Sequence, residues 1–435
     1  MVRCKSLAAF FAVVALPTSA LMAQVTKPAD PIAPLPDATA QTPPAAQPET
    51  PPAPPPPPFW QIGQAQALLT YINAIGKEGL TPADYDPAGL VAALRSGDPL
   101  KVSAEATDRF NRLSSDLALG HVRGKDRIDW HVEDNDLSPE RQRQLLDYAL
   151  STDSLAKTLD DLLPTHPQYA SLRQSLAATP ASDTATINKI RLNMDRWRWL
   201  PRDLGDRYII VNVPSYYATL VENGTTRWKT RAVAGAIKTP TPQLTAKAVG
   251  VILNPWWEVP TSISGEVAGK DGFVPVKGKD GKIQRWRQPP GPSNALGQLK
   301  FVMYNPQNIY LHDTNAKSRF NSSVRAASHG CIRTKDVVTL ATMLLGDDGG
   351  EWTPDKIQQT LADKKTVQAN FVKPLPVYIV YFSVAATNDG SLVRYNDVYQ
   401  RDGNVIAALL DAKGAAPEKA TPAKTAPVVK KVAAN

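Results

Sequence analysis

Apolar side chains recur every three to four residues through residues 59–179, which is the spacing of one buried helical face. In the first segment the recurring positions are Ala65, Leu68, Leu69, Ile72 and Ile75. Gly79 and Pro82 follow them, and these residue types commonly end a helix. Further segments with the same spacing are 87–97, 103–122, 138–151, 154–164 and 168–178. We therefore expect this part of the chain to be helical throughout.

One more amphipathic helix is predicted before the pattern changes, and it should end before Pro201. Its apolar positions are Ile187, Ile190, Leu192 and Met194. Trp197 and Trp199 near its end could form a ligand-stacking pair, but bulky aromatic residues at a domain junction more often bury core area. We therefore favour a packing role for both and place a helical scaffold domain at 59–200.

Beyond residue 200 the spacing becomes that of strands. Residues 207–235 are rich in β-branched and aromatic side chains on either side of ENG at 222–224, which is typical of a two-residue hairpin turn. Further strand candidates are 248–259, 298–305, 308–314 and 375–387. One helix is expected from 335 to about 345. The pattern predicts an α+β protein in which a β-rich domain at 201–383 follows the helical scaffold domain.

Two other segments complete the predicted folded body. Residues 262–290 are rich in glycine, proline and lysine and lie between strand candidates. We expect a long loop there, and long loops in compact domains often serve as lids. Residues 384–411 should form a C-terminal segment that packs on the body.

The first 58 residues are not expected to fold. Arg3 and Lys5 precede an apolar run and then small residues, which predicts a signal peptide over 1–23. The apolar run is shorter than the about 20 residues that cross a bilayer, so no stable membrane insertion is expected. Residues 24–58 contain 14 prolines among 35 residues and should form an extended linker.

The net charge of +8 is unevenly distributed. The tail at 412–435 holds five lysines and one glutamate in a Lys/Ala/Pro context, which is typical of disorder. This tail could bind an anionic polymer or could be a solvated end. Nucleic acid is not an expected partner, because no stretch interleaves aromatic residues with a basic stripe.

Three histidines precede the β-rich domain. His121, His131 and His166 have neither the spacing of metal ligands nor a neighbouring nucleophile. We therefore expect surface or capping roles for them.

Candidate chemistry gathers around Cys331, the single cysteine that would remain after removal of a signal peptide carrying Cys4. Exported proteins usually pair their cysteines. His329 lies two residues before Cys331, and His312 ends a strand candidate. An imidazole can take the proton of a thiol, and Gly330 allows backbone N–H groups to converge as an oxyanion hole. A helix beginning just after Cys331 would further favour the thiolate.

Three interpretations of this cluster are open from the residues alone. Cys331 could be a buried structural cysteine, because free cysteine is among the most buried residue types. His312, His329 and Cys331 could instead bind zinc. The third interpretation, which we favour, is a Cys/His acyl-transfer enzyme, because ligands on both sides of one glycine fit a tetrahedral metal shell poorly.

The segment HDTNAKSRFNSSVRAASHGCIR, residues 312–333, resembles the signature of YkuD-type L,D-transpeptidases. In that family a histidine is followed after fourteen to seventeen residues by Ser/Thr-His-Gly-Cys, and here fifteen residues separate His312 from Ser328. The segments at 190–214, 287–301 and 376–384 are similar to the YcbB-like branch, and the resemblance covers about 59–410. The peptidoglycan-binding module of larger members is not evident.

The resemblance implies roles for eight residues. Cys331 matches the nucleophile and His312 the general base, whose imidazole would be oriented by the backbone carbonyl of Asp313. The other positions, which would line the donor site or the oxyanion hole, are Tyr310, Ser328, His329, Gly330 and Arg333. The fold implied is a YkuD-type catalytic domain at 201–383 with its lid at about 262–290. No metal and no cofactor are expected.

The implied reaction joins two stem peptides of peptidoglycan. Cys331 would attack the third residue of a donor tetrapeptide, release D-Ala and form a thioester, which an amine of an acceptor stem would resolve. Other acceptors would give a cross-link to stem residue one, D-amino-acid exchange, L,D-carboxypeptidase activity, or attachment or detachment of a lipoprotein. The expected partners are stem peptides and carbapenem-type inhibitors, and the expected location is the periplasm, in association with the cell wall.

Overall fold

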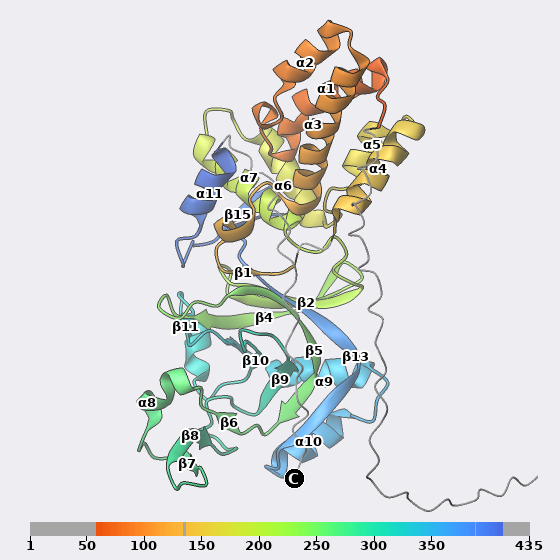
Figure 1. Ribbon diagram of the computed structural model, residues 1–435. Helices are drawn as coiled ribbons and strands as arrows, with labels where there is room; N and C mark the ends of the chain where they lie inside the picture. The colour runs from red at the N-terminus through yellow and green to blue at the C-terminus, as the bar shows by residue number, and fades with distance from the viewer. Residues whose placement is uncertain (1–57, 134–135, 388, 412–435) are drawn as a thin grey trace, which may run out of the picture. The chain divides into compact units, whose positions relative to one another are not determined.

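The computed structural model describes residues 58–133, 136–387 and 389–411 (Figure 1). The predicted signal peptide, the proline-rich linker up to residue 57 and the tail at 412–435 lie outside this part. Within the described ranges, no helix is long and apolar enough to cross a membrane.

The first part of the folded body is built from the predicted helices. They are α1 (Ile62–Asn73), η1 (Ile75–Glu78), η2 (Pro82–Tyr85), α2 (Pro87–Ser96), α3 (Pro99–Leu119), η3 (Gly124–Arg127), α4 (Pro139–Ser151), α5 (Leu155–Asp160), α6 (Pro167–Ala178) and α7 (Thr184–Arg198). Local chemistry sets where they begin. The Asp98 carboxylate accepts a hydrogen bond from the N–H of Leu100 at 3.0 Å, and the Ser138 hydroxyl accepts one from Arg141 at 3.1 Å. Proline at the first helical position needs no such partner.

The periodic apolar positions form one core between these helices. Leu68, Ile72 and Ile75 are fully buried together with Phe110 of α3, whereas Leu69 is only partly buried. Burying a side chain of this size contributes about 1.5–3 kcal/mol relative to leaving it exposed, so the helical face that the sequence predicts is also the face that stabilises the fold.

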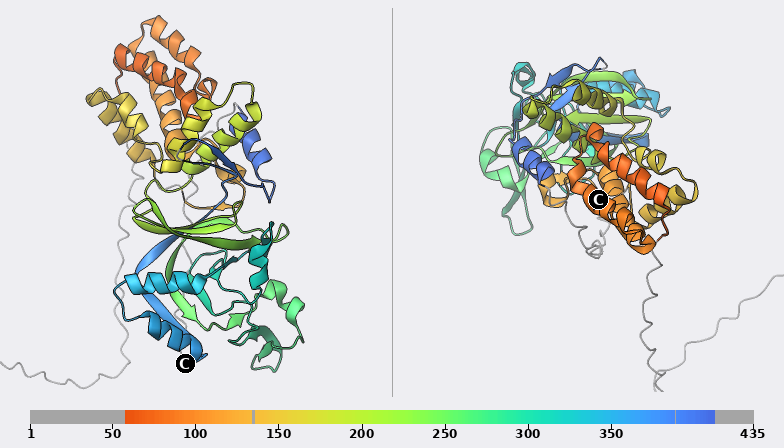
Figure 2. Two further views of the ribbon diagram at one scale, coloured as in Figure 1. Left: turned by 180° about the vertical axis from the view of Figure 1, so that it is seen from behind. Right: turned by 90° about the horizontal axis from the view of Figure 1, so that it is seen from above.

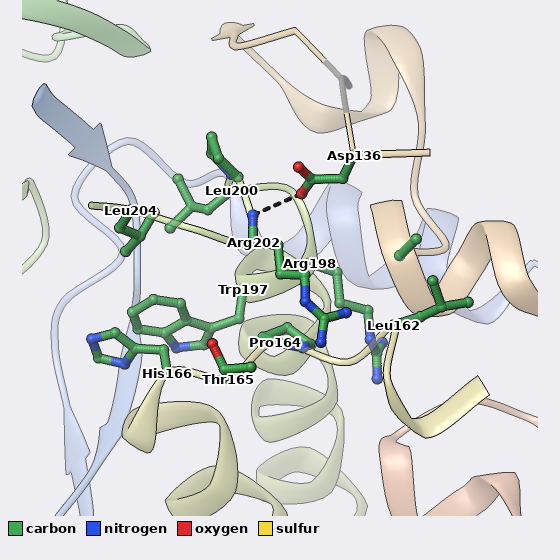
Figure 3. Close-up of a pocket in the computed structure, with 12 residues that line it drawn as sticks. Asp136, Leu162, Pro164, Thr165, His166, Trp197, Arg198, Leu200, Arg202 and Leu204 are labelled. Carbon is green, nitrogen blue, oxygen red and sulfur yellow. Dashed lines mark hydrogen bonds between the residues drawn. The ribbon is translucent and has the colours of Figure 1, made fainter. Parts of the chain in front are cut away.

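The two tryptophans at the end of α7 are packing residues, as predicted. Trp199 is 2 % exposed, and Trp197 lies between His166 and Phe382, with ring centroids 4.1 Å and 4.5 Å away. Figure 3 shows the imidazole of His166 beside this indole, in the lining of a small hollow. Both faces of Trp197 are therefore covered, which leaves no face for a ligand to stack on.

The three early histidines have different roles. His166 caps α6, because its Nδ1 accepts a hydrogen bond from the N–H of Gln168 at 3.1 Å, which confirms a capping role. His131 is partly exposed, with Nε2 3.1 Å from a carboxylate oxygen of Asp129. The expectation for His121 was wrong: its side chain is buried, and Nδ1 lies 2.7 Å from the Asp116 carboxylate. The partly exposed Asp116 carboxylate supplies the polar partner that solvent would supply to an exposed histidine.

The second part of the body is β-rich. Its strands are β2 (Arg207–Asn212), β3 (Tyr217–Glu222), β4 (Thr225–Gly235), β5 (Gln243–Leu253), β9 (Leu299–Met303), β10 (Leu311–His312), β11 (Ala326–Ser328), β12 (Ile332–Thr334) and β13 (Val367–Val380). Neighbouring strands follow the order β5-β13-β2-β3-β4-β12-β10-β9, and β9 also pairs with β5. The sheet therefore closes on itself around an apolar core.

The predicted hairpin is confirmed. Asn223 and Gly224 have φ values of 48° and 73° and connect β3 to β4 as a two-residue turn. Positive φ at both positions is the requirement of this turn type, and asparagine and glycine tolerate it best. The predicted α+β class, with helices before a β-rich domain, is likewise confirmed.

Two helices follow β12 and cover part of the sheet (Figure 2). They are α9 (Val337–Asp347) and α10 (Pro354–Ala362). Leu340, Leu344 and Ile357 bury their side chains in the same core as the strands. The first helix begins two residues later than expected, and the second was not predicted.

Two other expectations were wrong. The helical part is not helical throughout, because β1 (Trp130–His131) pairs in parallel with β5. The segment at 262–290 is not a plain loop: it contains α8 (Ser264–Val267), β7 (Val274–Lys277) and β8 (Ile283–Gln288). These strands form a small sheet with β6 (Trp257–Glu258). Backbone pairing to residues outside the segment organises it, and composition does not reveal such pairing.

The C-terminal segment contains β14 (Val384–Ala386), β15 (Leu392–Arg394) and α11 (Asp402–Leu410). Val405 and Leu409 of α11 pack on Trp199 in a small apolar cluster. Arg196 of α7 forms a buried ion pair of 2.8 Å with Asp402. The segment that follows β13 thus packs against helix α7 of the helical part.

Candidate active site

Two short parallel strands, β10 and β12, bring several of the predicted site residues together. Leu311 of β10 pairs with Ile332 of β12, and both side chains are fully buried in the core. Successive side chains on a strand point to opposite faces, so the residues on either side of this pair lie on the other face of the two strands. The N–H of Ile332 donates to the carbonyl of Tyr310 at 3.0 Å, which sets Cys331 beside Tyr310. Tyr310, Cys331 and the next register pair, His312 and Arg333, consequently share one face.

The loop from Ser328 to Cys331 is held by its own serine. The Ser328 hydroxyl donates to the carbonyl of Cys331 at 2.6 Å and accepts from the N–H of Gly330 at 3.2 Å. Gly330 has a φ of +112°, a backbone conformation that residues with a side chain rarely adopt. The N–H of Gly330 is therefore engaged within the loop and is not free to bind an oxyanion. The N–H of Cys331 makes no hydrogen bond within the described part of the chain.

The thiol of Cys331 is held in its neutral form. Sγ donates to the carbonyl of Asn308 at 3.6 Å. Burial raises the pKa of the Cys331 thiol, and hydrogen bonds with Tyr310 and the charges of Lys300 and Arg333 oppose that shift only in part. The predicted helix-dipole contribution was wrong, because strand β12 follows Cys331 and α9 begins only at Val337. The helix macrodipole acts within about one turn of the helix end.

His312 is buried and neutral. Its side chain is 5 % exposed, and burial, followed by the positive charge of Arg333, lowers the pKa of His312 to about 3. The backbone of Asp313 acts in the opposite direction, although Nδ1 has no partner with regular hydrogen-bond geometry. The ring of Tyr310 packs edge-on at 5.6 Å. A neutral imidazole has a lone pair that can accept a proton, and His312 lies on the same strand face as the Cys331 thiol.

The pH dependence of stability should report this buried imidazole. An exposed histidine has a pKa near 6.5, so between about pH 6.5 and 3 the unfolded chain binds a proton that folded His312 does not. The free energy of unfolding is therefore expected to fall as the pH drops through this window, by up to about 1.4 kcal/mol per pH unit. Urea unfolding at pH 7, 6 and 5 should show a shallower slope for His312→Asn than for the unsubstituted protein. Equal slopes would contradict a depressed pKa.

His329 contacts a neighbouring helix. Its side chain is about half exposed, and Nε2 lies 3.4 Å from a carboxylate oxygen of Glu266 in α8. The histidine adjacent to the cysteine thus contacts the 262–290 segment, whereas the more distant His312 lies on the face of the thiol.

The Asp313 carboxylate has a structural role, because it connects neighbouring segments of the chain. It is buried, accepts a hydrogen bond from the N–H of Gln298 at 3.0 Å and pairs with Lys317. The side chain is thereby turned to the start of β9. The predicted role of this residue rests on its backbone carbonyl and stays a prediction.

Lys300 is a site residue that sequence reasoning missed. It is the antiparallel register partner of His312, and its Nζ lies 5.3 Å from the ring centre of Tyr310. Burial lowers the pKa of Lys300, and the negative charge of a Cys331 thiolate would oppose that shift. A lone lysine between two buried apolar residues of a strand was the available signal, but its meaning depends on a strand pairing that the sequence does not reveal.

A metal site finds no support in the geometry. Among the residues that the structure places, no three His, Cys, Asp or Glu side chains form a group that could hold a metal ion.

Comparison with known families identifies two domains in this chain. Residues 206–379 match the L,D-transpeptidase catalytic domain model (YkuD), and residues 56–176 match the Scaffold domain model. This chain carries a YkuD L,D-transpeptidase domain. The suspected family is therefore confirmed, and the combination of a Scaffold domain and a YkuD domain is the architecture of the YcbB-like branch.

The individual relatives have low sequence identity to this chain. A putative L,D-transpeptidase of Haemophilus influenzae is 30 % identical over 300 residues, which cover 62 % of this chain and 58 % of that protein. The match thus spans less than two thirds of the relative. An L,D-transpeptidase structure from Mycobacterium smegmatis is 16 % identical, covering 40 % of this chain and 58 % of its own, with a TM-score of 0.21. One from Enterococcus faecium, a cysteine-to-serine mutant, is 13 % identical over 42 % and 52 %, with a TM-score of 0.22. Scores this low place no constraint on the YkuD site.

Proposed function

We propose that this protein is an exported cysteine L,D-transpeptidase that joins stem peptides of peptidoglycan. The proposal is supported by the YkuD match of residues 206–379 and by one structural observation above all. His312, Tyr310, Cys331 and Arg333 lie on one face of two paired strands, next to a free backbone N–H at the nucleophile.

The first half-reaction transfers the donor to the enzyme. As Sγ of Cys331 bonds to the carbonyl carbon of the third residue of a tetrapeptide, the thiol proton passes to His312. The carbonyl oxygen becomes an oxyanion that the N–H of Cys331 stabilises. Collapse breaks the peptide C–N bond, and the proton from His312 goes to the departing nitrogen of D-Ala. A thioester remains on Cys331.

The second half-reaction transfers the acyl group to an amine. The side-chain amine of a diamino acid in a neighbouring stem attacks the thioester carbonyl and loses a proton to His312. The C–S bond then breaks, and the thiol regains that proton. The same thioester would serve the other acceptors predicted from the sequence, so the acceptor is the part of the proposal that product analysis decides.

Two cations suit a donor that carries a carboxylate. Neither Arg333 nor Lys300 forms an ion pair within the described residues, and both lie on the face of Cys331. A guanidinium binds a carboxylate with two parallel hydrogen bonds, whereas an ammonium acts as a compact charge. We assign Arg333 to the terminal carboxylate of the donor and Lys300 to the charge that develops at sulfur.

Replacing the nucleophile gives the direct test of this activity. Cys331→Ala is expected to abolish cross-linked product from purified disaccharide tetrapeptide, because no thioester can form. The products are identified by mass spectrometry, which also shows the acceptor. Cross-linked product at an unreduced rate with the alanine variant would contradict the proposal, and a matching unfolding curve shows that the variant is folded.

The partners and location follow from the same proposal. A carbapenem presents a strained carbonyl to the same thiol, so carbapenems should acylate Cys331. The basic start and short apolar run at 1–23 support export to the periplasm, where the cell wall is accessible.

A further inference from the structure

The loop that joins β4 to β5 holds the backbone of the nucleophile loop. The Thr241 hydroxyl donates to the carbonyl of Gly330 at 2.6 Å and accepts from the N–H of Gly235 at 2.9 Å. The Thr239 hydroxyl donates to the carbonyl of Ser328 at 3.0 Å. Thr241 is fully buried, so these bonds do not compete with solvent.

The bond to Gly330 acts directly on the oxyanion donor. The carbonyl of Gly330 and the N–H of Cys331 belong to one planar trans peptide unit and point in opposite directions. Fixing that carbonyl therefore fixes the direction of the N–H. Without the bond, this peptide could rotate readily, because the glycine on its N-terminal side permits most backbone conformations.

A tyrosine from the C-terminal segment holds the same loop from the other side. The Tyr399 hydroxyl donates to the carbonyl of Gly235 at 2.6 Å and accepts from the N–H of Thr241 at 3.1 Å. Gly235 is thus bonded at its N–H by Thr241 and at its carbonyl by Tyr399. A side chain at Gly235 would lie 2.2 Å from the carbonyl oxygen of Thr239, so the loop closes tightly over a glycine.

Tyr399 is itself fixed by charged and aromatic neighbours. Its N–H donates to the hydroxyl of Tyr381 at 2.8 Å, and that hydroxyl donates to Asp397 at 2.6 Å. The guanidinium of Arg401 lies 5.0 Å from the ring centres of both tyrosines and bonds to Asp129 of the helical part at 2.5 Å. The chain beyond the last catalytic strand is therefore connected to the nucleophile loop by a continuous set of hydrogen bonds.

We propose that Thr241 and Tyr399 are positioning residues that aim the N–H of Cys331 at the oxyanion of the proposed acyl transfer. The inference rests on the proposed function, and it makes the C-terminal segment part of the catalytic apparatus. Neither residue touches substrate. Thr241 acts through the carbonyl of Gly330, and Tyr399 acts through Thr241 and Gly235.

Two reactions of the same thiol separate this role from simple support of the fold. Acylation by a carbapenem passes through an oxyanion, whereas alkylation by iodoacetamide does not. Both rates are measured on the full chain by intact-protein mass spectrometry. Thr241→Val keeps the shape of the side chain and removes its hydroxyl, whereas Thr241→Ser retains a hydroxyl. Tyr399→Phe removes the hydroxyl that bonds to Gly235 and Thr241. Tyr395→Phe is the matched control, because its hydroxyl bonds to neither loop.

Removal of an oxyanion donor slows acyl transfer by about 10²–10³-fold, so a misdirected donor in Thr241→Val should slow acylation by about 10–100-fold. Alkylation should stay within about threefold, Thr241→Ser should recover most of the acylation rate, and Tyr399→Phe should slow acylation in the same selective way. Equal losses in both reactions, or no loss in either, would overturn the inference. If Thr241→Val does not fold, Tyr399→Phe and Thr241→Ser decide the outcome. An unsubstituted protein that is alkylated but never acylated would instead contradict the proposed function, and the inference with it.

Discussion

Replacing His312 by asparagine is expected to slow acylation of Cys331 by a carbapenem by about 10²–10⁴-fold, which is the usual contribution of a general base. The thiol of Cys331 is neutral because burial raises its pKa, so it needs a base at the moment of attack. His312 is neutral at ordinary pH because burial and the charge of Arg333 lower its pKa to about 3. The rate is measured by quenching the reaction at timed intervals and recording the mass of the intact protein.

His329→Asn is the matched control for that experiment. The side chain of His329 is exposed and faces Glu266, so its loss should change acylation by less than about fivefold. A larger loss in His329→Asn than in His312→Asn would show that the adjacent histidine is the base and would contradict the assignment. An acylation rate in His312→Asn that is restored by raising the pH would agree with it, because hydroxide can then deprotonate the thiol.

The largest expected effect on stability is at Asp195 of α7. This fully buried carboxylate accepts hydrogen bonds from the N–H groups of His121 at 2.6 Å and Val122 at 3.1 Å and from Nε1 of Trp199 at 3.0 Å. It also pairs with the buried Arg198. Asp195→Ala is expected to lower the free energy of unfolding by about 3–5 kcal/mol, because it leaves three buried donors without an acceptor and removes the carboxylate that pairs with Arg198.

Asp183→Ala provides the comparison on the same helix. Asp183 is exposed and caps the N-terminus of α7 through the N–H of Thr186 at 3.1 Å. Losing such a cap costs about 1 kcal/mol. Both variants are measured by urea unfolding at constant pH. A cost at Asp195 that is no greater than the cost at Asp183 would contradict the view that the Asp195 network holds the end of α7.

Local sequence patterns predicted the parts of the fold that local physics determines. The period of Leu68, Ile72 and Ile75 identified the buried face of α1, and the turn at Asn223 and Gly224 defined a hairpin. A helical face and a primed turn are each decided within about ten residues, so a single sequence contains the information. The signature around His312 and Cys331 likewise indicated which residues lie together.

Features that depend on long-range pairing were missed. Trp130 and His131 form a strand only because they pair with β5. The small sheet at 274–288 arises from pairing with Trp257 and Glu258. Lys300 belongs to the site because β9 lies antiparallel to β10, and Tyr399 reaches it from the far end of the chain. Hydrophobic period and composition contain no record of which strands become neighbours.

The central claim is that Cys331 accepts the stem peptide as a thioester. Incubating the purified full chain with disaccharide tetrapeptide at low temperature, quenching in acid and mapping peptides by mass spectrometry tests it directly. The account predicts an adduct on Cys331 with the mass of the donor less its terminal D-Ala, present in the unsubstituted protein and absent from Cys331→Ala. Cross-linked product formed without any adduct on Cys331, or an adduct on another residue, would contradict it.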